Sequence, residues 1–114
     1  MTVNEYLAAT YAPKEIGNRL YQKPRPAIKC ADGFHISVQA GEHLYCRPRE
    51  TFVGPFSAVE CGFPSGPVPT LAEWKDSSDE DDTQTVYGYV PVHIVDTLLD
   101  AHGGIVYSPA KENA

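Results

Sequence analysis

The spacing of apolar side chains predicts a short helix at the start of the chain. One helical face collects four apolar residues: Val3, Tyr6, Leu7 and Tyr11. Thr2 and Glu5 stand three residues apart, as in a capping box, in which each side chain binds the backbone N–H of the other residue. Pro13 marks the end of the helix, because the residue before a proline disfavours helical angles.

Residues 27–40 alternate between apolar and polar side chains and predict a β-hairpin. Asp32 and Gly33 supply the turn, since glycine accepts the positive φ that such turns need. The resulting register places two pairs on the buried face: Cys30 with Phe34, and Ile28 with Ile36. A slip by one residue would mix polar and apolar groups on each face.

Further strands follow the hairpin. Three are predicted: 44–46, 56–61 and 84–90. In the last of them, Gly88 indicates a bulge or a close approach of the backbone. Strand alternation places Tyr87 and Tyr89 on one face, either in the core or at an interface.

Two proline- and glycine-containing stretches interrupt this pattern. Residues 17–27 are predicted to cross the fold irregularly, and 62–69 to form a loop. Thr70 and Glu73 repeat the capping-box spacing over a one-turn helix that carries Trp74.

The clearest helix begins near Pro91, a residue that suits the first helical position. Its apolar stripe holds four residues: Ile94, Val95, Leu98 and Leu99. Gly103 is placed to end the helix in the left-handed conformation, and residues 105–107 return as a short strand or an extended tail.

This order of elements predicts an α+β fold: a small, mostly antiparallel sheet packed by the C-terminal helix, with a short N-terminal helix. We expect a single domain over residues 1–114. Within it, 76–82 is predicted to be a mobile acidic loop and 108–114 a disordered tail.

The net charge of −6 is divided unevenly along the chain. Residues 1–49 carry a net charge of +3, and residues 50–114 carry −9. The acidic half argues against direct binding to nucleic acid or to an anionic membrane. It suits a basic partner, although acidity also serves simply to keep a small protein soluble.

No stretch approaches the roughly 20 apolar residues of a membrane span, and the N-terminus lacks a signal-peptide pattern. The odd count of three cysteines suggests a reducing compartment with buried thiols. Five potential metal ligands lie close in sequence: Cys30, His35, His43, Cys46 and Cys61. They include no CxxC pair, and the hairpin register separates Cys30 from His35, so we predict no metal site and no cofactor.

Catalytic motifs are also missing, and we predict that the protein is not an enzyme. The pair His43 and Cys46 is the only arrangement of a cysteine and a base worth testing for nucleophilic catalysis. Arg47 beside Cys46 would lower the pKa of the thiol by stabilising the thiolate. Nearness along a strand does not bring two side chains together, so this thiol chemistry is disfavoured.

The stretch "EHLYCRPRE", residues 42–50, is the best candidate ligand site. Arg47 and Arg49 lie on either side of Pro48, so an extended chain directs both to one side, with Tyr45. Arginine forks suit carboxylates and phosphates, and the ring offers a stacking surface. The alternative is that the arginines pair internally, with the acidic loop or with Glu50 and Glu60.

A second candidate surface is acidic and would face a basic partner protein. It comprises Glu73, Asp76, Asp79, Glu80, Asp81 and Asp82.

Three runs of sequence carry a resemblance to a known set of proteins. They are "DGFHISVQAGEHLYCRPRE", "VECGFPS" and "VYGYVPVHIVDTLLDAHGGI", within residues 28–105. In the order of these landmarks the chain resembles small uncharacterised proteins encoded by tailed bacteriophages. The resemblance implies a phage gene product in the cytoplasm of an infected bacterium.

Together these observations favour a non-catalytic accessory protein that acts by binding. The preferred hypothesis is inhibition of a host protein, such as a defence complex. The alternative is a module that sequesters an anionic small molecule or nucleotide through Tyr45, Arg47 and Arg49.

Overall fold

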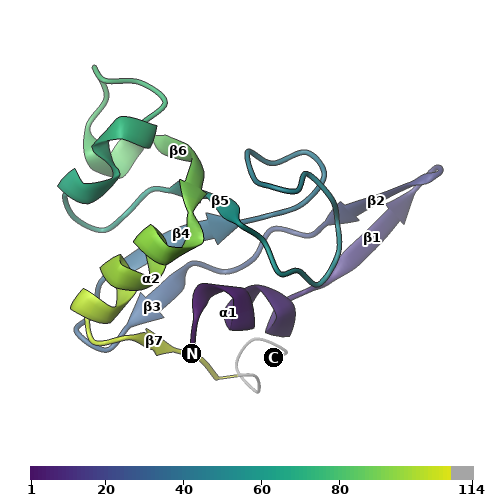
Figure 1. Cartoon of the computed structure of the whole chain (residues 1–114), viewed down its shortest axis with the longest axis horizontal. Coiled ribbons are helices and arrows are strands. Elements are labelled where there is room, and N and C mark those ends of the chain that lie inside the picture. Colours follow the sequence, from purple (N-terminus) through teal and green to yellow (C-terminus); the bar gives the residue numbers. More distant parts are fainter. Residues whose placement is uncertain (109–114) are drawn as a thin grey trace.

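The computed structural model describes residues 1–108 and shows a mixed α+β domain (Figure 1). Its elements, in chain order, are α1 (Val3–Ala9), β1 (Pro13–Ile16), β2 (Arg19–Gln22), β3 (Ile28–Cys30), β4 (His35–Gln39), β5 (Ala58–Gly62), the 3₁₀ helices η1 (Pro69–Trp74) and η2 (Asp82–Gln84), β6 (Val86–Pro91), α2 (Val92–Ala101) and β7 (Ile105–Val106). The predicted fold class is confirmed. The predicted tail at 108–114 falls almost wholly on residues 109–114, which lie outside the described residues.

Five strands form one antiparallel sheet in the order β6-β5-β4-β3-β7. Both α-helices lie over the same face of this sheet (Figure 1). The opposite face of β4 carries polar side chains that are at least partly exposed, so this strand is apolar on one side only. The ribbon β1–β2 is separate and projects from the body of the molecule.

Local sequence signals account for several elements. The backbone N–H of Glu5 donates to the Thr2 hydroxyl (3.1 Å), and the N–H of Thr2 donates to the Glu5 carboxylate (2.7 Å), which confirms the first capping box. The hairpin register is also confirmed: Ile28 pairs with Ile36, and the N–H of Cys30 donates to the carbonyl of Phe34. The turn at Asp32 and Gly33 and the alternation of buried and exposed residues in β3 and β4 favour the same register, so no other register competes with it.

The end of α2 follows the prediction as well. Gly103 has a φ of +93°, and its N–H donates to the carbonyl of Asp100 (3.0 Å). A Cβ added at Gly103 would lie only 2.8 Å from the Cβ of Ala31. Position 103 therefore requires glycine for two reasons: the left-handed φ and the close packing against Ala31. Pro91 is the N-cap rather than the first helical residue.

Three further predictions of local structure are wrong. Residues 17–27 are not irregular throughout, because β2 pairs with β1 around a turn at Gly17, where φ is +63°. Residues 44–46 form no strand, and this segment folds back on Gly41. The second capping box does not form: η1 begins after Val68 without a side-chain cap, and the Asp82 carboxylate accepts the Val68 N–H (2.9 Å) instead.

Candidate binding site

Two arginine–tyrosine pairs form one cluster on the surface of the molecule. The guanidinium carbon of Arg47 lies 4.9 Å from the ring centroid of Tyr89, and that of Arg49 lies 5.8 Å from the centroid of Tyr45. The two rings are 5.8 Å apart and inclined by 30°. The structure thus brings together the three residues predicted from the sequence and adds Tyr89. We call these four residues the Arg–Tyr cluster.

A turn, rather than a strand, presents Tyr45 and the arginines. The Cys46 thiol is buried and accepts the N–H of Gly41 (3.3 Å), while the N–H of Leu44 donates to the carbonyl of Gly41 (3.1 Å). The N–H of Arg47 donates to Ala58 in β5 (3.0 Å). A buried anchor between Tyr45 and Arg47 therefore leaves both side chains exposed on the outside.

An irregularity in the β5–β6 pairing places Tyr89. Val59 pairs with Val90 and Cys61 with Tyr87, so Glu60 alone faces two residues of β6. Such an extra residue bends a strand and redirects its side chains. Tyr87 consequently points into the core with no exposed surface, while Tyr89 lies half-buried on the outer side with a φ of +57°. The prediction that the two tyrosines share a face is wrong.

Gly88 joins the bulge to the turn, as the sequence indicated. A Cβ at this position would lie 3.2 Å from the Cβ of Tyr45. The backbone of Tyr45 is held on both sides: its carbonyl accepts the Tyr89 N–H (2.9 Å), and its N–H donates to the Glu60 carboxylate (2.9 Å). The backbone positions of both tyrosines are thus fixed by the fold.

The guanidinium groups are left without carboxylate partners. Within residues 1–108, neither Arg47 nor Arg49 forms an ion pair, and the one hydrogen bond from either guanidinium runs from Nε of Arg49 to the carbonyl of Leu44 (3.1 Å). The acidic partners proposed from the sequence do not pair with them; Glu60 binds the backbone of Tyr45 instead. Both side chains are exposed, so their remaining N–H donors face solvent.

A shallow, open groove of about 420 Å³ runs beside the two tyrosine rings. Its lining residues are Tyr45, Glu73, Trp74, Lys75, Asp76, Gly88 and Tyr89. The end of η1 is held against β6, because the N–H of Asp76 donates to the carbonyl of Val86 (2.9 Å). Two residues of the predicted acidic surface, Glu73 and Asp76, thus share a groove with the rings of the Arg–Tyr cluster. Trp74 also lines the groove, although the sequence predicted no functional role for it.

The predicted acidic surface divides into two groups. Asp82 accepts from the ammonium group of Lys75 (2.9 Å) and from the backbone of Val68 (2.9 Å), and Asp81 binds the hydroxyl and N–H of Thr83. These side-chain hydrogen bonds lower the pKa of both carboxyl groups. Asp81 and Asp82 therefore also hold the loop in place.

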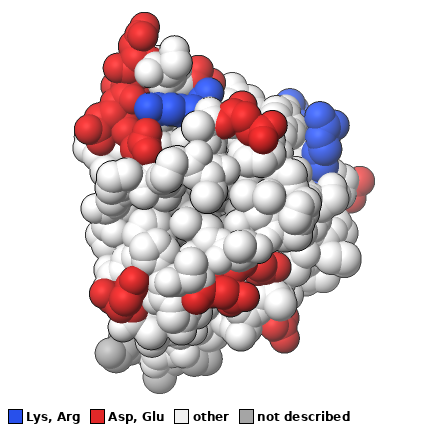
Figure 2. All heavy atoms as spheres, turned by 60° about the vertical axis from the view of Figure 1, so that its left-hand side comes forward, with Lys and Arg blue, Asp and Glu red and all other residues white. Residues whose placement is uncertain are grey.

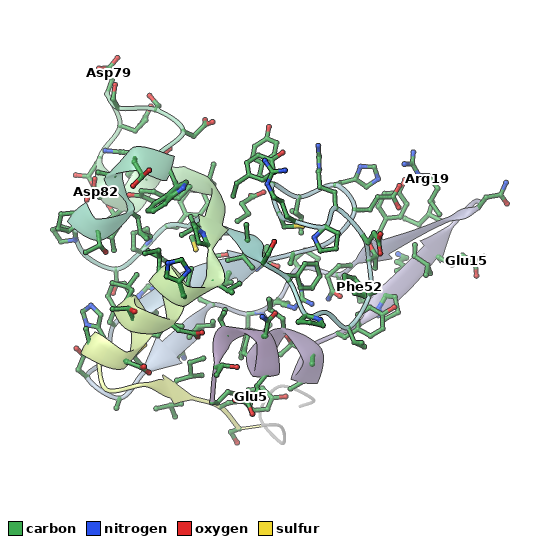
Figure 3. The ribbon with its side chains drawn as sticks, viewed as in Figure 1. Glu5, Glu15, Arg19, Phe52, Asp79 and Asp82 are labelled. Atoms are coloured by element: carbon green, nitrogen blue, oxygen red, sulfur yellow. The ribbon has the colours of Figure 1, made fainter. Side chains whose placement is uncertain are left out.

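The other four carboxylates of the acidic surface make no hydrogen bond or ion pair to the described part of the chain: Glu73, Asp76, Asp79 and Glu80. In Figure 3, Asp79 lies at the tip of the loop and points away from the body, whereas Asp82 lies closer to it. Figure 2 shows acidic side chains gathered at this end of the molecule. That the loop is mobile stays a prediction.

The thiol chemistry that the sequence disfavours at His43 and Cys46 finds no support in the geometry either. Burial raises the pKa of the Cys46 thiol, so the predicted lowering by Arg47 is wrong. His43 stacks on Tyr21, with ring centroids 4.7 Å apart, and makes no contact with the thiol among the described hydrogen bonds. Cys30 is buried and His35 exposed, as the hairpin register predicts. Within residues 1–108, no three histidine, cysteine or carboxylate side chains are grouped so that they could hold a metal ion.

Among the helices that the structure describes, none has the length and apolar character needed to cross a bilayer. Comparisons of the chain with protein-family models, with curated proteins and with solved structures gave no match. The resemblance to phage proteins stays a prediction. Function is therefore argued from the Arg–Tyr cluster and its groove.

Proposed function

We propose that this protein is a non-catalytic accessory protein of a bacteriophage that binds a host protein and inhibits it. The observation that carries the proposal is the Arg–Tyr cluster, in which Arg47 and Arg49 are exposed, lie over tyrosine rings and are unpaired with any carboxylate of the described chain. Tyrosine, tryptophan and arginine are the residues that contribute most to binding at protein interfaces. Here all three types lie in one surface region.

The stacking also prepares the arginines for binding. A guanidinium resting on a ring has already lost part of its conformational freedom, so less entropy is lost when it binds a partner. Hydrogen bonds fix the backbone of both tyrosines. The N–H of Tyr45 donates to the Glu60 carboxylate in β5, and the N–H of Tyr89 donates to the carbonyl of Tyr45. A preorganised patch of this kind suits a partner's carboxylates and carbonyl groups.

The acidic end of the molecule extends this surface. Glu73 and Asp76 line the groove beside the rings, and Asp79 and Glu80 continue outward along the loop. Exposed carboxylates favour a basic surface on the partner, because complementary charge speeds encounter and sets orientation. The partner surface we propose is therefore basic around a smaller acidic area that meets Arg47 and Arg49.

Affinity capture from a lysate of the host bacterium tests the proposal. The variant Arg47→Gln plus Arg49→Gln removes both charges of the cluster. The control, Lys14→Gln plus Lys29→Gln, removes two exposed charges outside the cluster, one from β1 and one from β3. We expect wild type and control to retain the same stoichiometric partner, and the cluster variant to lose it. Retention by all three proteins, or by none, contradicts the proposal.

A second test concerns the acidic surface. Asp79→Asn plus Glu80→Gln leaves the structural carboxylates Asp81 and Asp82 intact. With the captured partner, this variant should associate more slowly and with a weaker dependence on salt, because fewer charges steer the encounter. An unchanged association rate would exclude a steering role for the loop.

The absence of carboxylate partners for the two arginines in the described chain also favours a second function: sequestration of a small anion, such as a nucleotide. Phosphate groups would bind the arginine forks, and a base would stack on a tyrosine. ATP, GTP and inorganic phosphate are suitable probes. A rise in melting temperature with a nucleotide, abolished by Arg47→Gln plus Arg49→Gln, would support this function. If no nucleotide shifts the melting temperature, it fails.

A further inference from the structure

The groove beside the Arg–Tyr cluster has the composition of a receptor for a cationic side chain. Three aromatic residues line it, Tyr45, Trp74 and Tyr89, together with the carboxylates of Glu73 and Asp76. Aromatic faces attract cations through their quadrupole, and the attraction grows as the cation loses water. Adjacent carboxylates add charge-assisted hydrogen bonds.

Among the residues that line this groove, the uncompensated charge is negative. Lys75 also lines it, but its ammonium group lies 2.9 Å from the Asp82 carboxylate, and its side chain is only 14% exposed. Glu73 and Asp76 have no such partner in the described chain and are exposed. Arg47 and Arg49 are not among the residues that line the groove. An incoming cation would therefore meet two available carboxylates.

The chain itself shows that these rings accept guanidinium groups. Arg47 lies over the ring of Tyr89 and Arg49 over that of Tyr45. A guanidinium is planar and weakly hydrated, so it stacks on a ring while its edge binds a carboxylate in a fork, which an ammonium group cannot do. The open shape of the groove also suits a side chain projecting from a larger surface better than an enclosed free ligand.

We infer that the groove formed by Tyr45, Trp74, Tyr89, Glu73 and Asp76 binds an arginine side chain of the partner protein. This inference rests on the proposed function and adds to it the chemical identity of the anchor. The arginine would stack against the aromatic lining and direct its N–H groups to Glu73 and Asp76. Arginine is a common hot-spot residue of protein interfaces.

The single tryptophan of the chain, Trp74, makes the test direct. Its indole N–H gives one cross-peak in a ¹H–¹⁵N spectrum, and it can be followed during titration with N-acetyl-arginine amide. We expect a saturable shift. The neutral isostere N-acetyl-citrulline amide should bind at least about tenfold more weakly, because it lacks the charge-assisted hydrogen bonds.

Two charge-matched variants locate the site. Glu73→Gln plus Asp76→Asn should abolish the arginine-dependent shift, whereas Asp79→Asn plus Glu80→Gln, which lies outside the groove lining, should preserve it. The side chains of Glu73 and Asp76 make no hydrogen bond within the described residues, so their replacement should leave the melting temperature unchanged.

Failure of this inference is distinguishable from failure of the proposed function. No shift with arginine, an equal shift with citrulline, or equal loss in both variants overturns the groove as an arginine receptor. If the lysate partner is still captured, the proposed function stands without this anchor. If arginine binds as expected but no partner is captured, the groove is supported and the proposed function fails.

Discussion

The guanidinium carbon of Arg47 lies 4.9 Å from the ring centroid of Tyr89, although β5 and both 3₁₀ helices separate the two residues in sequence. The contact depends on two departures from regular structure: the turn anchored by Cys46 and the bulge at Gly88 and Tyr89. Both leave side chains at the surface, although Cys46 and Tyr87 beside them are buried in the core. Irregular backbone that exposes side chains is characteristic of binding sites.

Replacement of Tyr89 by asparagine should separate binding from stability. The φ of +57° costs a tyrosine about 1 kcal/mol, and asparagine tolerates this angle better. That gain offsets part of the packing lost with the half-buried ring. We expect the free energy of unfolding in urea to change by less than about 1 kcal/mol, and partner capture to be lost.

The control for that experiment is Tyr87→Phe. The Tyr87 hydroxyl donates to the carbonyl of Asp82 (2.7 Å) inside the fold, so its loss should cost about 1 kcal/mol and leave capture intact. Equal capture by wild type and Tyr89→Asn would show that the ring has no part in binding.

Arg25 is a buried cation whose removal should be costly. Only 5% of the residue is exposed, and it donates to three acceptors: the carbonyls of Leu7 and Ala40 and the hydroxyl of Thr10. Burial lowers its pKa to about 10, so it remains charged at neutral pH. Arg25→Gln should lower the free energy of unfolding by about 3 kcal/mol, because the buried acceptors lose their donors.

Arg19→Gln is the comparison, since the ion pair of Arg19 with Glu42 is exposed and solvent screening leaves it with little effect on stability. Urea unfolding measures both variants. A loss for Arg25→Gln no larger than that for Arg19→Gln would mean that Arg25 does not hold α1 to the turn after β4.

Asp32 should give the protein part of its sensitivity to acid. The backbone N–H of Phe34 and the ring of His102, whose Nδ1 lies 2.7 Å from the carboxylate, lower the pKa of Asp32. A lowered carboxyl pKa stabilises the fold above the unfolded-state pKa, and this stabilisation is lost as the pH falls through the folded-state value.

The stability difference between wild type and Asp32→Asn should therefore shrink as the pH falls below about 4. Urea unfolding at several pH values measures it. Asp79→Asn, at the loop tip without a described partner, should leave the free energy of unfolding at neutral pH unchanged. A difference for Asp32→Asn that is independent of pH would contradict the assignment.

The three thiols should be inert in the folded protein. Burial raises the pKa of Cys30 and Cys46, and raises that of Cys61 to about 12. The thiolate is the reactive form, so iodoacetamide at neutral pH should modify none of them rapidly until urea is added. Mass spectrometry counts the modified sites. Rapid alkylation of Cys46 in the native state would contradict this prediction and show that its thiol is reactive.

Local patterns predicted those parts of the fold in which short-range and long-range preferences agree. The Thr2–Glu5 cap, the hairpin around Gly33 and the end of α2 at Gly103 each combine a propensity with a burial pattern. The β1–β2 ribbon was not predicted. Its strands have no buried face, so folding does not require an alternation of apolar and polar residues along them.

The site was predicted in part, for a similar reason. Composition alone pointed to Tyr45, Arg47 and Arg49, but the extended chain assumed for them is a turn. Tyr89 reaches the cluster because the β5–β6 register shifts beside Glu60, and strand alternation cannot predict such a shift. Trp74 joins the groove through the pairing of η1's end with β6, a tertiary contact without a local signal.

Hydrogen exchange on the free protein and on the captured complex tests the central claim most directly. The account predicts that bound partner slows exchange in peptides covering residues 44–50 and 72–80, with little change in the β1–β2 ribbon at 13–22. Protection confined to the ribbon, or to α2, with residues 44–50 and 72–80 unchanged, would contradict it.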